Sequence, residues 1–247
     1  MIYILSKRQN FFLGHLAISV LITLLVVGLV FFVWYPSPLG TAVGVTQIFL
    51  MMLAIDVIIG PVLGLLVYKE GKKTLKMDLS IIMLLQLSAL TYGVYSIEQG
   101  RPAWLAYNVD RFELVRKNEI IEDNIAKALP QYQTVSWLKP QFVGVEFDQD
   151  AKNRSDDMFA EALGGISLAQ KPERYVDFTQ AMPQLKQGAK SLDMLKQFND
   201  EKLVQNILAK YPQAIGFVPL KAINLDMTVL VDKEGNVAKI VDLRPWK

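Results

Sequence analysis

The sequence predicts an α-helical membrane region of three transmembrane helices, followed by an α+β domain outside the membrane with antiparallel hairpins. The first observation is the distribution of charge, because residues 1–98 hold 10 Asp, Glu, Lys and Arg residues whereas residues 99–247 hold 40. The second is that the first part contains three long uncharged apolar runs. The third is that the second part alternates polar and apolar residues around turn-forming sequences. We therefore divide the chain into domains 1–98 and 99–247.

The three apolar runs are each long enough to cross a bilayer. Residues 11–35 and 41–68 form runs of 25 and 28 residues, separated by the helix-breaking sequence Pro36-Ser37-Pro38-Leu39-Gly40. A third run, 79–97, contains no charge over 19 residues. A helix needs about 20 residues to cross the hydrocarbon core. The sequence thus predicts spans at about 11–35, 41–68 and 79–97.

The orientation of these spans follows from the basic residues in the short loops. Lys7 and Arg8 precede the first span, and four lysines lie between the second and third spans, at Lys69, Lys72, Lys73 and Lys76. The loop at residues 36–40 has no charge. Because short cytoplasmic loops are enriched in Lys and Arg, we expect a cytoplasmic N-terminus and an outer location for residues 99–247.

Asp56 is the only Asp, Glu, Lys or Arg between residues 11 and 68. It lies about 18 Å from the cytoplasmic end of its span, close to the middle of the bilayer. An acid at that depth needs polar partners, and we expect them on the other two spans at the same depth. The expected partners are Thr23, Ser88, Thr91 and Tyr92. His15 lies only about 6 Å deep, so direct pairing with Asp56 is not expected.

The sequence Gly60-Pro61-Val62-Leu63-Gly64 follows Asp56 on the same span. Its two glycines allow close approach of another helix, and the proline removes one backbone hydrogen bond. One interpretation is internal, with the glycines seating the other two spans of this chain. The other is that this face receives the transmembrane helix of a partner. The candidate contact residues for such a partner are Asp56, Gly60, Pro61, Gly64 and His15.

The outer half predicts an α+β domain of about 149 residues, which is enough for one core. The clearest hairpin joins strands at 225–231 and 237–243 through a turn at 232–236 that contains Gly235. Further elements follow from apolar periodicity, turn residues and capping residues. They are a strand-turn-strand at 101–115, a helix at 118–129, a strand at 142–147, a helix at 155–163 capped by Ser155, and a helical region at 191–208 broken near 198–200.

Several kinds of chemistry are excluded or unsupported by the residue types present. The chain has no Cys and one His, and that His lies in the membrane half, which removes disulfides, thiolate sites and a Ser-His-Asp triad from the outer domain. The outer half has 20 basic and 20 acidic residues, so it offers no basic face for nucleic acid. The acidic group Asp148, Asp150, Asp156 and Asp157 lacks the spacing of a calcium loop and is interpreted as solvated surface. No catalytic, cofactor or metal site is predicted, and we do not expect an enzyme.

Several sequence segments, taken in order, resemble a known family. They are Asp56-Val57-Ile58-Ile59-Gly60-Pro61, the stretch from Gly71 to Leu79, the stretch from Leu85 to Gly93, Arg101-Pro102, Asp110-Arg111-Phe112 and the closing Arg244-Pro245-Trp246. In this order they resemble the type IV pilin accessory proteins called TfpX/TfpZ, for which FimB is a related name. The similarity runs along the whole chain. Glu70 departs from the family pattern, which has a proline there.

The resemblance implies a non-enzymatic factor of the bacterial inner membrane that supports assembly of a cognate major pilin into type IV pili. A pilin awaiting assembly has one transmembrane helix and a globular head outside, so this chain is expected to recognise both. His15 lies at the depth where pilins of the family carry a buried acid. Membrane lipids and the pilus assembly-platform proteins are further expected partners. Two alternatives remain open: a general subunit of the assembly platform, and a membrane-tethered periplasmic enzyme acting on envelope glycans or on pilin.

Overall fold

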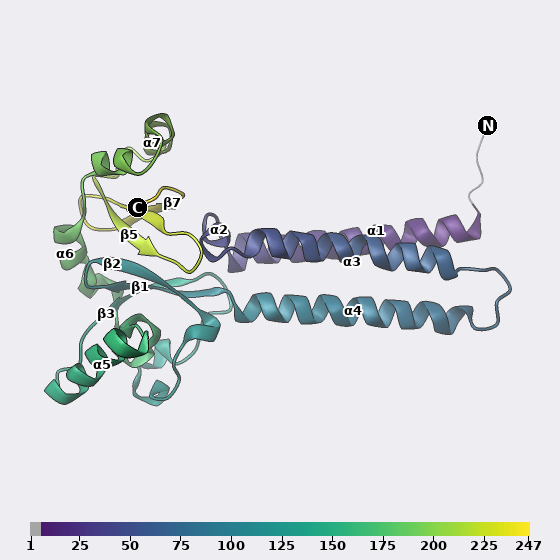
Figure 1. Ribbon diagram of the computed structural model, residues 1–247, viewed down its shortest axis with the longest axis horizontal. Coiled ribbons are helices and arrows are strands. Elements are labelled where there is room, and N and C mark those ends of the chain that lie inside the picture. Colours follow the sequence, from purple (N-terminus) through teal and green to yellow (C-terminus); the bar gives the residue numbers. More distant parts are fainter. Residues whose placement is uncertain (1–5) are drawn as a thin grey trace. The chain divides into compact units, whose positions relative to one another are not determined.

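The computed structural model describes residues 6–247, which form two compact units. The first unit contains the described residues up to Val33 together with Val45–Gln99. The second contains Trp34–Gly44 together with Gly100–Lys247. Figure 1 shows the long helices of the first unit and the sheet of the second.

The first unit is built from three long helices. α1 (Lys7–Leu29) continues into a π-helical turn at Val30–Trp34, and α3 (Val45–Val67) and α4 (Leu75–Gln99) follow. All three are long and apolar enough to cross a membrane. α3 is the central helix and packs along both α1 and α4 (Figure 1). The prediction of three long apolar helices is therefore confirmed.

The second predicted span, 41–68, begins later than expected. A short helix, α2 (Leu39–Val43), ends at Gly44, whose φ of +80° interrupts the helix before α3 starts. The carbonyl of Ala42 accepts hydrogen bonds from the backbone N–H groups of Asn224 and Leu225 at 3.1 and 3.2 Å. Leu39 belongs to the core of the second unit. The loop between the first two spans therefore folds with the outer domain.

The outer domain contains one seven-stranded mixed sheet with the order β4-β3-β1-β2-β5-β6-β7. β1 and β2 form the predicted antiparallel hairpin, and β6 and β7 form the second, with Gly235 at a φ of +91° in the turn. However, β1 pairs with β3 and β2 pairs with β5 in parallel. The expectation of antiparallel hairpins thus describes only part of the sheet. The strands are β1 (Pro102–Asn108), β2 (Arg111–Arg116), β3 (Gln141–Val145), β4 (Tyr175–Val176), β5 (Gly216–Lys221), β6 (Met227–Val231) and β7 (Val237–Val241).

Both faces of this sheet are covered, as the fully buried β1 shows. On one face Leu105 and Tyr107 join a core that includes residues of α2 and of α6 (Phe178–Gly188). On the other face Trp104 packs edge-on against Tyr132 and Tyr175. A third cluster lies under α7 (Glu201–Leu208) and the 3-10 helix at Leu192–Gln197, which confirms the broken helical region predicted at 191–208.

Two predicted helices of the outer domain need correction. The segment 118–129 is not one helix: it holds 3-10 turns at Lys117–Glu119 and Ile125–Lys127. The backbone N–H of Ile121 donates to the carbonyl of Gln170 instead of to its own turn, so a continuous helix cannot form there. The helix predicted at 155–163 is α5 (Ala151–Gly164), and its N-cap is Asp150, whose carboxylate accepts from two backbone N–H groups.

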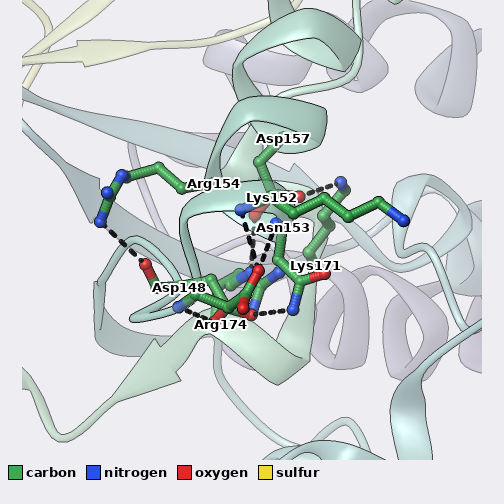
Figure 2. Close-up of polar contacts among 8 residues, drawn as sticks. Asp148, Lys152, Asn153, Arg154, Asp157, Lys171 and Arg174 are labelled. Atoms are coloured by element: carbon green, nitrogen blue, oxygen red, sulfur yellow. Dashed lines mark hydrogen bonds and ion pairs between the residues drawn. The ribbon is translucent and has the colours of Figure 1, made fainter.

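An ion-pair network docks α5 onto the loop before β4 (Figure 2). Asp157 is 4% exposed and accepts from Lys171 at 2.6 Å and from Arg174 at 2.8 Å. Arg174 also donates to Asp148 at 2.5 Å. The interpretation of these aspartates as solvated surface is therefore wrong for Asp157.

The backbone N–H of Asp150, together with Arg174, lowers the pKa of Asp148. Asp148 therefore adds to the free energy of unfolding at any pH above its pKa in the unfolded chain, which is about 3.9. This contribution is lost as the pH falls through the lower pKa that Asp148 has in the folded protein.

Substituting Asp157 by Ala should detach α5 from the domain. Both cations would keep their burial and lose an anionic partner, so we expect a loss of about 3 kcal/mol in the free energy of unfolding of this region. Hydrogen exchange of the α5 amides in the full chain, held in nanodiscs, measures the change. The matched control is Asp156→Ala, an exposed neighbour on the same helix. Equal exchange in the two variants would contradict a docking role for Asp157.

Candidate functional site

The side-chain amide of Gln86 joins the three membrane helices. Gln86 lies at the middle of α4, and its Nε2 donates to Ser19 Oγ of α1 at 3.1 Å and to the carbonyl oxygen of Asp56 on α3 at 2.9 Å. Its Oε1 lies 2.9 Å from Nε2 of His15 on α1. An amide oxygen only accepts, so the His15 Nε2 donates in this pair. One residue of α4 thus holds both other helices.

Two polar atoms beside this amide lack partners. Among residues 6–247, Oδ2 of Asp56 and Nδ1 of His15 are buried without a hydrogen-bond partner. Nδ1 of His15 faces α3 at Gly64, where an added Cβ atom would lie 3.4 Å away. Asp56 occupies the middle of α3, about 17 Å from its end. A polar atom without a partner is costly in the bilayer, where no water replaces it. These atoms make the polar cluster of His15, Ser19, Asp56 and Gln86 a candidate site.

The cluster lies in an open groove of about 450 Å³ among the three helices. Asp56 is the one α3 residue in its lining, and the other residues come from α1 and α4. Polar side chains occupy one part of the groove and apolar side chains the rest. The apolar part is Ile18, Ile22, Met83, Leu84, Leu87 and Leu90, and the polar part is His15, Ser19, Thr23, Asp56, Ser80 and Gln86.

The glycine face of α3 is covered by the other helices of the same unit. Gly60, Pro61 and Gly64 are all buried. A Cβ atom on Gly60 would lie 1.9 Å from Oε1 of Gln86, and one on Gly64 would lie 3.0 Å from the ring of Phe11. This burial agrees with the internal interpretation, in which the two glycines seat the other two helices of this chain. Of the five candidate contact residues, Asp56 and His15 line the groove.

Of the four polar partners expected for Asp56, one lines the groove and three lie elsewhere on α4. Thr23 lines the groove with Asp56. Ser88 and Thr91 instead donate to the carbonyls of Leu84 and Leu87 on their own helix, and Tyr92 is 73% exposed. The expectation for these three residues is corrected, because helical rise fixes the depth of a residue and not the direction in which it points.

Sequence reasoning missed Gln86 and Ser19, which carry most of the hydrogen bonds of the site. A signal for Gln86 was present, since it is an amide at the centre of an otherwise apolar span. A side chain with two donors and an acceptor at that depth requires polar partners on neighbouring helices. In the outer domain, the described residues hold no group of three or more His, Asp or Glu side chains that could bind a metal ion.

Comparison with known proteins relates the chain to pilus assembly proteins. The family model described as Fimbrial assembly protein FimB matches residues 5–44. The fimbrial assembly protein of serogroups C1 and C2 from Dichelobacter nodosus is 34% identical over 116 residues, which cover 46% of this chain and 88% of that protein. The chain belongs to the FimB family of fimbrial assembly proteins. The resemblance predicted from the sequence is thereby confirmed.

Other FimB relatives extend the match along the chain. The fimbrial assembly protein of serogroup I from Dichelobacter nodosus is 28% identical over 238 residues, 93% of this chain and 92% of that protein. The serogroup E1 protein from the same organism is 27% identical over a stretch of the same length. No solved structure matches the chain significantly.

Gly60 leaves room for the Gln86 amide, so Gly60→Ala should act through Gln86. The added methyl group would displace the amide from Ser19 and Asp56, and we expect a loss of about 2 kcal/mol in the free energy of unfolding. Unfolding of the full chain in mixed micelles by added dodecyl sulfate measures it. Gly14→Ala is the matched control, since a Cβ atom there meets nothing within 4 Å.

The same unfolding measurement is made on Gln86→Leu and on the double variant that combines Gly60→Ala with Gln86→Leu. If Gly60→Ala works by displacing the amide, its effect should largely vanish in the Gln86→Leu background. Full additivity of the two substitutions would contradict this mechanism.

Proposed function

We propose that this chain is a non-enzymatic accessory factor for type IV pilus assembly, which holds its cognate major pilin in the inner membrane before the subunit enters the pilus. The groove among α1, α3 and α4 receives the transmembrane helix of the pilin, and the outer domain contacts the globular head. Membership of a family of fimbrial assembly proteins supports the pilus-assembly role.

The observation that carries the proposal is the side chain of Asp56, which lines an open groove among three apolar helices and whose buried Oδ2 has no hydrogen-bond partner. The amide of Gln86 is not free to serve this oxygen, because it is already hydrogen-bonded to Ser19, His15 and the Asp56 backbone. A lipid chain in the groove would offer Asp56 no hydrogen bond. A transmembrane helix with a polar group on one face satisfies it.

The rest of the groove suits the apolar part of such a helix. Ile18, Met83 and Leu87 line it and are 60%, 54% and 58% exposed. Side chains of this kind pack against a partner helix through close contacts, since burial from lipid gives no hydrophobic gain. The polar and apolar parts of the groove together favour a partner helix that is mainly apolar and carries one polar group near its middle.

The contact with the pilin head is proposed for the exposed face of α5. Met158, Phe159 and Leu163 on this helix are 57%, 66% and 78% exposed, and Phe159 and Leu163 lie four residues apart on one face. Asp157 anchors the helix from its buried side. Two weak contacts made from one membrane raise the effective concentration of the pilin and still allow its release into the pilus.

We propose the orientation that the loop charges favour, with a cytoplasmic N-terminus and residues 100–247 in the periplasm. In this orientation the outer domain lies on the side where a pilin carries its head. The lysines between α3 and α4 then face the anionic inner leaflet. A general platform subunit and a periplasmic enzyme are the competing functions.

Photocrosslinking from the groove tests the proposal. A photoreactive residue at Met83, which lines the groove, should capture the major pilin in cells that assemble pili. The matched control is Leu85, two positions along the same helix, which is 66% exposed and lies outside the groove lining. Because positions two apart point to nearly opposite sides of a helix, we expect pilin capture from Met83 to be about tenfold stronger.

Each other outcome points to a different function. Capture of assembly-platform proteins at Met83, with the pilin absent, would favour a general platform subunit. Equal capture at both positions would mean that the groove has no special role. Unchanged pilus number in a strain lacking the chain would contradict the assembly role itself.

A further inference from the structure

A short loop of the outer domain presents two large apolar side chains to its surroundings. Trp137 and Leu138 are each 61% exposed. The loop has a defined shape, because the backbone N–H of Leu138 donates to Oγ of Ser136 at 3.2 Å. Adjacent exposed residues of this size need an explanation when their backbone is held in place.

The first contact that holds this loop comes from the end of a membrane span. Nε1 of Trp34 donates to the carbonyl of Trp137 at 3.2 Å, and the two indole rings meet edge to face with centroids 5.4 Å apart. Trp34 is the last residue of the first candidate span, Lys7–Trp34. Trp137 is therefore in contact with a residue that chain connectivity places at the membrane surface.

A second contact comes from the end of another span. Nη2 of Arg101 donates to the carbonyl of Ser136 at 2.6 Å. Arg101 lies two residues after Gln99, which ends the third candidate span, Leu75–Gln99. The loop is thus held by one residue at the end of the first candidate span and by another just after the end of the third.

The register of the sheet agrees with these contacts. β3 runs parallel to β1 with Trp104 opposite Gln141. β1 begins at Pro102, directly after the third span, so the residues that precede β3 lie at the level where the chain enters the outer domain. Trp137 and Leu138 therefore lie at the edge of the domain where its chain leaves the membrane.

We infer that Trp137 and Leu138 insert into the interface of the bilayer and hold the outer domain against the membrane surface. Trp is favoured at this depth because its ring is apolar and its N–H is polar, and Leu partitions into the apolar region below. Lys139 follows them, is exposed, and can extend its ammonium group to lipid phosphates. This surface acts on lipid, and the inference does not depend on the identity of the pilin.

The absence of Cys from the chain allows a direct test with the full protein. Leu138→Cys, labelled with a nitroxide, is placed in nanodiscs of phosphatidylethanolamine and phosphatidylglycerol. Collision of the label with oxygen, which enters the bilayer, is compared with collision with a water-soluble nickel chelate. The control is Ile215→Cys, because Ile215 is 60% exposed and precedes β5.

The two sites lie at opposite ends of the sheet. β5 runs parallel to β2 with Leu220 opposite Phe112, and β2 ends at Arg116 opposite Pro102. The start of β5 at Gly216 is therefore eight residues along the strands from that edge, or about 26 Å. We expect the ratio of oxygen to nickel collisions to be about threefold or more higher at Leu138 than at Ile215. Trp137→Cys should give the same result as Leu138→Cys.

Two results would overturn the inference. Equal ratios of oxygen to nickel collisions at Leu138 and Ile215 would mean that the loop of Trp137 and Leu138 is surrounded by water. A label at Leu138 that neither reagent reaches would mean that protein, in place of lipid, covers the loop.

Discussion

The membrane unit depends on one side-chain amide, that of Gln86, which hydrogen-bonds to both neighbouring helices. Inside a bilayer such bonds are the directional contacts available, since apolar side chains gain little by leaving lipid for protein. The amide also explains Gly60, whose missing side chain leaves the space that Gln86 occupies. With Gln86 committed in this way, Oδ2 of Asp56 remains without a hydrogen-bond partner among the described residues. The position of Gln86 therefore accounts both for the hydrogen bonds that join the three helices and for the oxygen of Asp56 that has no partner.

The outer domain depends on the membrane loops in a different way. Leu39 and Ala42, from the loop between the first two spans, are buried in its core. Asn224 and Leu225 donate to that loop from the far end of the sequence. The domain is thus completed by a helix, Leu39–Val43, that ends 59 residues before the first strand begins at Pro102. The outer domain is therefore built from two stretches of the chain that are far apart in sequence.

The sequence predicted those features that depend on local pattern, and missed those that depend on distant contacts. Run length identified three long apolar helices, and alternation around Gly235 identified the last hairpin. Depth along a helix nominated Thr23, which lines the same groove as Asp56. It also nominated Thr91, whose hydroxyl donates to its own helix, because rise carries no information on direction. β5 was not predicted, and it contains Pro219, a residue that is disfavoured inside a sheet. The strand is possible because its pairing with β2 is confined to Leu220 and Lys221. The segment 118–129 has helical periodicity, but the hydrogen bond from Ile121 to Gln170 overrides it.

The most direct test of the groove uses disulfide formation. Met83→Cys supplies the one thiol of this chain, and single cysteines are placed in turn along the membrane helix of the major pilin. A pilin helix lying in the groove predicts cross-links that recur every three to four residues, on one face, near the middle of the helix. Gln86 remains in place, so the groove is preserved. Cross-links absent at every position, or distributed equally around the pilin helix, would contradict the account.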